Sequence, residues 1–176
     1  LQVIEDGKID LKKFGEIVES LNELISTVYL LYEKVENIKF EDHPKIEIVD
    51  SGSDINFVIK LPEKAANLIA QLFKQMWDVI INNKSYRYRQ RLKDFEETIT
   101  VIEKINEAKN NGSIEPEMAE VLKKGLIENA EKIIFRNTVT KQIVLESVEY
   151  SNRQVLIEKT NTLLLEEGKE KDDSEK

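Results

Sequence analysis

Residues 62–110 carry the pattern of one very long helical stretch, and the phase of its apolar positions changes near the middle. The apolar residues of the first half follow one helical face: Ala65, Ile69, Leu72, Met76 and Val79. A second line with the same spacing occupies the other half: Tyr88, Leu92, Phe95, Ile99 and Ile102. The offset between the two lines is about 200° around a helix. The two halves therefore cannot bury against one partner in a single straight helix.

The two halves are expected to join over residues 82–91, because Asn-Asn-Lys-Ser at 82–85 has poor helix propensity. The first half is also interrupted by polar side chains: Asn67, Gln71, Lys74, Gln75 and Asp78. These interruptions favour a buried core helix over a membrane-surface anchor. A membrane-spanning helix is not expected, since about 18 unbroken apolar residues would be needed.

An N-terminal helix is predicted from Asp10 to about Glu36, with the Asp10 carboxylate as its cap. Its apolar face is broad: Phe14, Ile17, Val18, Leu21, Leu24, Ile25, Val28, Leu31, Tyr32 and Val35. A face this wide favours packing in a globular core over a free coiled-coil dimer. We expect this helix to pack against the apolar half of the long stretch.

Short β-patterns surround these helices. Residues 45–49 and 55–61 alternate and flank an Asp/Ser/Gly-rich turn, which predicts an antiparallel hairpin. Residues 1–4 are predicted to form a weak strand. The Asp/Ser/Gly residues at 50–54 fit a turn better than a calcium loop, because the EF-hand spacing is absent.

A second helix pair is predicted around residue 112. Gly112 suits a left-handed helix end, and Pro116 suits the first turn of a helix that runs to about Arg136. The apolar face of that helix comprises Ala119, Leu122, Leu126, Ala130 and Ile133. We expect an antiparallel helical hairpin in which this face packs against the line from Leu92 to Ile102.

These elements predict an α+β protein, predominantly helical, with long amphipathic helices, a helical hairpin and a small antiparallel sheet. Residues 1–84 would hold the N-terminal helix, the β-hairpin and the apolar core helix, and residues 85–136 the helical hairpin. Residues 137–166 form a β-rich segment with expected strands at 142–149 and 154–159, for which a helix is the alternative. Residues 167–176 are predicted to be a disordered tail.

Composition excludes several kinds of chemistry. The 176 residues contain no cysteine, which rules out disulfides, thiolate zinc sites and cysteine nucleophiles. The single histidine, His43, lies beside Pro44 and cannot form a multi-histidine site. The common phosphate-binding, dinucleotide-binding, zinc-protease and nucleophile-elbow motifs are absent. No catalytic residue, cofactor-binding residue or metal ligand is therefore predicted, and we expect a protein that is not an enzyme.

One concentrated basic run stands out on a chain of net charge −8. Its candidate partner-binding residues are Tyr86, Arg87, Tyr88, Arg89 and Arg91. They could dock an acidic protein, or contact nucleic acid through arginine–phosphate pairs and tyrosine stacking. The simpler interpretation is a solvated helix whose arginines pair with acidic neighbours such as Asp94. Nucleic acid is disfavoured because the negative chain repels phosphates.

The sequence thus predicts a non-enzymatic protein–protein interaction or assembly protein. The chain has three apolar lines, which start at Phe14, Ala65 and Leu92. They offer more apolar surface than one small core obviously needs, so self-association into a homo-oligomer through amphipathic helices is expected. A nucleic-acid-binding protein is the alternative, and a carboxylate-dependent enzyme is the second alternative. The absence of cysteine and of a signal-peptide pattern in the charged first twenty residues favours the cytoplasm.

Overall fold

The computed structural model describes residues 2–3, 10–51, 55–82, 94–95, 97–136 and 138–139. Helices dominate these residues: α1 (Leu11–Glu36), α2 (Glu63–Asn82), α4 (Thr100–Asn110) and α5 (Pro116–Phe135). A small sheet accompanies them: β1 (Gln2–Val3), β2 (Lys45–Ser51), β3 (Ile55–Lys60) and β4 (Thr138–Val139). The predicted class, α+β with helices predominant, is confirmed.

The sheet has the strand order β2-β3-β1-β4. β2 and β3 form the predicted antiparallel hairpin, with Lys45 opposite Lys60 and Ser51 opposite Ile55. The predicted N-terminal strand is present as β1, in which Gln2 pairs with Asn56 of β3 and with Val139 of β4. The strands expected at 142–149 and 154–159, and the tail after residue 166, lie outside the described residues.

Helix α1 begins and ends where the sequence predicts. The Asp10 Oδ1 accepts a hydrogen bond of 2.7 Å from the Lys13 backbone N–H, which confirms Asp10 as the cap. The helix ends at Glu36, and Asn37 adopts a left-handed conformation with φ of 54°. Asparagine tolerates that conformation better than most side chains, so the chain can turn away into the linker before Pro44.

The stretch from 62 to 110 is broken at Ile99. The Pro62 carbonyl accepts the first helical hydrogen bond from Ala66 N–H, and α2 is described as far as Asn82. The rest of the predicted joint, residues 83–91, lies outside the described residues. The expectation of helix through the second half is wrong at Ile99, which is extended (φ −86°, ψ 111°). Residues 98–102 (Thr-Ile-Thr-Val-Ile) are all β-branched, and such side chains lower helix propensity by crowding the preceding turn.

The predicted hairpin of α4 and α5 is confirmed. Gly112 has a φ of 76°, and the Ser113 N–H bonds the Ala108 carbonyl at 2.9 Å while Gly112 N–H bonds Lys109 at 3.2 Å. These two bonds define a Schellman ending. Pro116 occupies the first turn of α5, where its missing N–H costs nothing.

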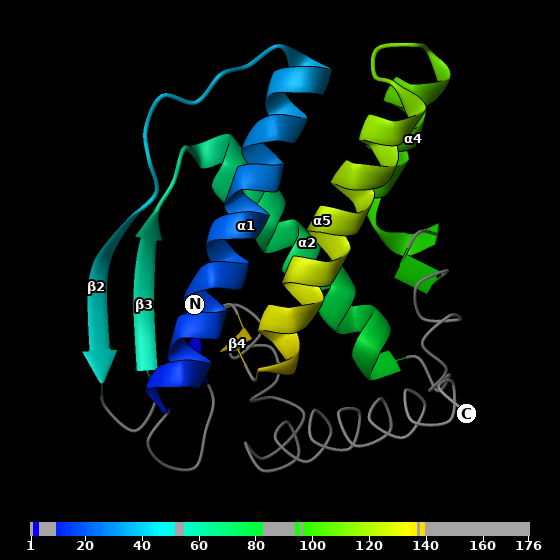
Figure 1. The fold of residues 1–176 in the computed structure, drawn as a ribbon. Helices are drawn as coiled ribbons and strands as arrows, with labels where there is room; N and C mark the ends of the chain where they lie inside the picture. Colours follow the sequence, from blue (N-terminus) through cyan, green and yellow to red (C-terminus); the bar gives the residue numbers. More distant parts are fainter. Residues whose placement is uncertain are drawn as a thin grey trace.

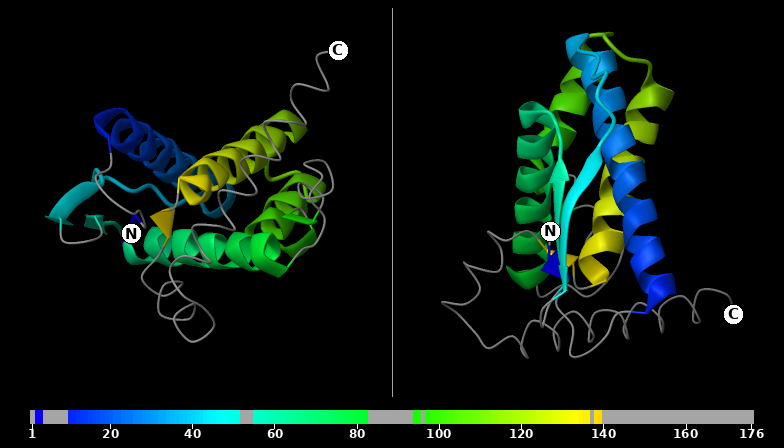
Figure 2. Two further views of the ribbon diagram at one scale, coloured as in Figure 1. Left: turned by 90° about the horizontal axis from the view of Figure 1, so that it is seen from below. Right: turned by 90° about the vertical axis from the view of Figure 1, so that its left-hand side faces the viewer.

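The main neighbour of α5 differs from the prediction. The predicted apolar face of α5 is buried, but among the described helices α1 contacts α5 more extensively than α4 does. The reason is length: α1 has 26 residues and α4 only 11. Figure 1 shows α1 and α5 side by side with α2 crossing behind them, and the end-on view in Figure 2 agrees.

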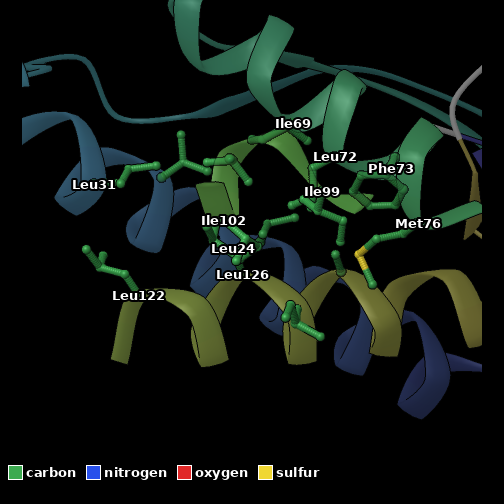
Figure 3. Close-up of a cluster of buried hydrophobic side chains, with 14 of the residues drawn as sticks. Leu24, Leu31, Ile69, Leu72, Phe73, Met76, Ile99, Ile102, Leu122 and Leu126 are labelled. Carbon is green, nitrogen blue, oxygen red and sulfur yellow. The ribbon is translucent and has the colours of Figure 1, made fainter. Parts of the chain in front are cut away.

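Helices α1, α2, α4 and α5 contribute to one apolar core (Figure 3). Leu72 and Met76 of the first line meet Ile99 and Ile102 of the second line there, because the chain is not one straight helix between them. Every described member of the line from Ala65 to Val79 and of the line from Tyr88 to Ile102 is buried. The middle of the apolar face of α1 is buried too: Leu21, Ile25, Val28 and Tyr32. The premise that three apolar lines exceed the needs of one core therefore does not hold for the described residues.

None of the helices that the structure describes is long and apolar enough to cross a membrane.

Candidate functional site

An open groove of about 440 Å³ lies between α2, the C-terminal end of α1 and the first turns of α4. It follows α2 from Lys64 to Gln75, a length of roughly 16 Å at 1.5 Å per residue. Its lining comprises Tyr32, Glu36, Lys64, Asn67, Leu68, Gln71, Leu72, Gln75, Thr100, Val101 and Lys104. The groove borders the core, since its lining includes the core residues Tyr32, Leu72 and Val101.

Three amide side chains form a row along the groove side of α2. Asn67, Gln71 and Gln75 are four residues apart, a spacing that puts side chains above one another on one helical face. Asn67 and Gln71 are exposed, whereas Gln75 is partly buried. The row therefore runs from open solvent to a protected end beside α4.

At the protected end, Gln75 holds the start of α4. Its Nε2 donates to the Thr100 Oγ1 at 2.6 Å, and the Thr100 backbone N–H donates to its Oε1 at 3.2 Å. The Gln71 Nε2 also reaches the Thr100 Oγ1, at a long 3.5 Å. Ile99, the residue before the helix, provides no side-chain cap. Gln75 thus replaces the missing cap from a different helix.

Apolar side chains line the groove below the amide row. Leu72 and Val101 are buried and Leu68 is partly buried. Tyr32 is also buried, and its hydroxyl donates to the Lys64 carbonyl oxygen at 3.1 Å. Burial, and secondarily the charge of Glu36, raises the pKa of Tyr32. Its hydroxyl therefore remains a protonated donor at neutral pH.

The groove carries a net positive charge, whereas the net charge of the whole chain is negative. Two lysines and one glutamate line it, although the chain carries a net charge of −8. Lys64 and Glu36 approach to 3.9 Å, with side chains 62% and 39% exposed, so their ion pair is marginal. Lys104 is exposed and makes no ion pair with another described residue. A ligand with a negative group is therefore favoured near Lys104.

The groove contains a single carboxylate, that of Glu36, so it does not supply the pair that a carboxylate-dependent enzyme needs. Across the described segments, no group of three or more histidine, aspartate or glutamate side chains could hold a metal ion.

The residues singled out from the sequence do not form this groove. Tyr86, Arg87, Tyr88, Arg89 and Arg91 lie outside the described residues, so the structure does not test them. His43 is exposed in the linker after α1. From the sequence, Asn67, Gln71 and Gln75 were interpreted only as polar interruptions of an apolar helix. Their regular spacing of four was the available signal, but it does not say which neighbouring element they face.

The chain matches no known family model, no curated protein and no solved structure.

Proposed function

We propose that this protein is a non-enzymatic protein-binding protein, and that the groove along α2 is its binding surface. One observation carries the proposal. A regular row of amide side chains, flanked by two lysines, lines an open groove, and two of the three amides, Asn67 and Gln71, are exposed. Amides donate and accept hydrogen bonds at once, which suits them to the mixed donors and acceptors of another polypeptide.

The shape of the groove supports a macromolecular partner over a small molecule. Pockets for small molecules are concave and enclose most of the ligand surface. This groove is open and extends for three turns of helix. An acidic protein partner agrees with its excess of lysine. A cytoplasmic location belongs to the same proposal, because a chain without cysteine suits a reducing compartment.

Site-specific photo-crosslinking tests the proposal. A photoreactive amino acid replaces Asn67, which is exposed in the groove, and in a separate control chain it replaces Asn22, which is exposed on α1 outside the groove. We expect position 67 to form a discrete adduct with another protein in cells that produce this chain. The adduct should fade when Gln71→Ala is added. Equal adducts from both positions, or none from position 67, would contradict the proposal.

Self-assembly is a second candidate, and a different surface supports it. The amphipathic helices that the sequence assigned to self-association bury their described apolar lines in the core. The strand β2, however, lies at the edge of the sheet. Ile46 on β2 and Val58 on β3 are 46% and 47% exposed. Exposed apolar edges are ready templates for pairing with another strand.

Light scattering at high protein concentration tests this candidate. We expect a dimer that Ile46→Lys dissociates, whereas Leu11→Lys, which changes an apolar residue 86% exposed on α1, should leave it intact. A strict monomer would exclude the edge as an assembly surface. Nucleic-acid binding through the run from Tyr86 to Arg91 stays an alternative prediction, and charge reversal of Arg87 and Arg91 tests it.

A further inference from the structure

We infer that the groove binds an extended, acidic peptide segment of a partner protein, held by the amide row through its backbone. This inference rests on the proposed function and specifies its ligand. The supporting features are the hydrogen bonds of Gln75, the spacing of the row and the charge of the two walls.

One amide of the row already binds the backbone of this chain. Gln75 binds the backbone N–H and the side-chain hydroxyl of Thr100, the first residue of α4, directly after the single extended residue Ile99. The amide oxygen accepts while the amide nitrogen donates, so one side chain satisfies two groups of one residue. Gln71 and Asn67 repeat the same chemistry farther along the groove, and both are exposed.

The spacing of the row matches an extended polypeptide. Four residues of α-helix advance roughly 6 Å. Two residues of an extended strand advance roughly 6.6–6.8 Å. Consecutive amides can therefore meet alternate peptide groups of a ligand that lies along α2. A helical ligand would present no free backbone groups to these amides, because its own hydrogen bonds already use them.

The charged and apolar side chains on the two sides of the groove would determine which peptide side chains bind there. Lys104 on α4 faces no ion-pair partner among the described residues, whereas Lys64 is near Glu36. One carboxylate on the peptide would pair with Lys104 and lose little hydration, since the site is open. Because side chains of a strand alternate in direction, the neighbouring position would point to the apolar lining at Leu68 and Val101.

A phage-displayed library of random octapeptides, panned against the full chain, tests the inference. We expect enriched peptides to contain Asp or Glu next to an apolar residue and to lack proline at the central positions. A synthetic peptide from the selection, labelled with fluorescein, should bind with a Kd that rises about tenfold for Gln71→Ala and for Lys104→Glu, as expected for the loss of one well-placed polar contact. Asn22→Ala and Lys12→Glu are matched controls on exposed sites of α1 and should not change the Kd.

Backbone recognition has its own readout. N-methylation of single peptide bonds in the synthetic ligand should weaken binding at alternate positions and spare the positions between them. Equal effects at every bond, binding unaffected by the groove variants, or failure of any octapeptide to enrich would overturn the inference. If position 67 still crosslinks to a partner protein in that case, protein binding stands and only the peptide mode is lost.

Discussion

At the scale of single residues, the contact between α5 and α1 depends on Gly125. A Cβ atom at this position would lie 2.8 Å from the Thr27 Oγ1 and 3.0 Å from the Thr27 Cγ2. Rotation of Thr27 about its Cα–Cβ bond would still leave its hydroxyl or its methyl group against the added Cβ, since the side chain branches at Cβ. The Thr27 hydroxyl is also committed to the Glu23 carbonyl oxygen at 2.8 Å. The absence of a side chain at Gly125 therefore lets α5 lie close to α1.

A double-mutant cycle measures this approach. Alanine in a helix interior is favoured over glycine by about 0.5–1 kcal/mol. We expect Gly125→Ala to destabilise the protein nevertheless, by about 1–3 kcal/mol, because overpacking forces the helices apart. In a Thr27→Ala background the same change should be neutral or stabilising. Urea denaturation gives the four stabilities of the cycle.

Gly15 provides the control for that cycle. It is exposed on α1, and an added Cβ would meet nothing within 4 Å. Gly15→Ala should therefore gain the full helical preference, about 0.5–1 kcal/mol. If Gly125→Ala gave the same gain as Gly15→Ala, the contact with Thr27 would have no energetic consequence.

At the scale of elements, the start of α4 depends on a side chain from α2. Thr100 begins the helix directly after the extended Ile99, and its N–H is satisfied by the Gln75 Oε1. The environment is partly buried, so an unsatisfied N–H at this point would cost about 1–3 kcal/mol. Gln75 thus determines where α4 begins as well as closing one end of the groove.

Substitution of Gln75 should show how much its side chain stabilises the start of α4. We expect Gln75→Ala to lower the free energy of unfolding by about 1–3 kcal/mol and to speed hydrogen exchange at the Thr100 amide. Gln75→Glu should recover part of the loss, because a carboxylate still accepts from the N–H and is favoured at a helix N-terminus. Gln71→Ala is the control and should change stability little, since its contact to Thr100 is long and exposed. Unchanged exchange at Thr100 in Gln75→Ala would contradict the assignment.

At the scale of the whole molecule, two side-chain ties connect distant parts of the chain. Arg136, at the end of α5, donates from Nε and Nη2 to the Glu16 Oε2 at 3.1 and 2.9 Å, joining α5 to the start of α1. At the other end of α1, Phe40 of the linker packs against Tyr29 in a tilted arrangement and against Tyr32 edge to face, with ring centroids 4.8 and 5.3 Å apart. The Tyr29 hydroxyl then donates to the Asp42 carbonyl oxygen, and the Tyr32 hydroxyl to that of Lys64.

Because of these two tyrosines, we expect the stability of the folded protein to decrease at alkaline pH. Burial raises the pKa of Tyr29 and Tyr32, assisted by the charges of Asp42 and Glu36 respectively. A raised pKa in the folded state means that the contribution is complete below the unfolded pKa of about 10 and is lost as pH rises through the folded pKa. We expect the free energy of unfolding to fall above about pH 10. The double variant Tyr29→Phe, Tyr32→Phe should show a shallower decline.

Urea denaturation between neutral and strongly alkaline pH is the measurement. Ile133→Val, near the end of α5 that lies beside the start of α1, is the control: it should lower stability by loss of buried apolar volume while the alkaline slope stays that of the parent chain. Identical slopes in the parent chain and the double tyrosine variant would mean that other groups cause the alkaline loss.

Local signals predicted the elements well, because each acts within one turn of chain. Asp10, Gly112 and Pro116 mark helix ends through contacts with residues close to them in sequence. The hairpin of β2 and β3 followed from alternation and a turn. The break at Ile99 was missed because its regular apolar spacing outweighed the β-branched run around it.

Packing partners were harder to predict, since an apolar face does not indicate which element of the fold covers it. The faces of α1 and α5 were identified correctly, but their mutual contact depends on the length of α1 and on Gly125. The candidate site was missed for the same reason. The spacing of Asn67, Gln71 and Gln75 puts them on one face of α2, and only the fold brings Thr100 to that face.

The sequence by itself determined the helical and strand segments and the apolar faces that enter the core. These properties depend on hydrogen bonds and side-chain periodicity within one segment. The tertiary structure alone decided that both halves of the 62–110 stretch share one core, and that a row of amides borders an open groove. Those outcomes depend on how close two helices can approach and on which buried N–H lacks a local partner, and both are properties of pairs of elements distant in sequence.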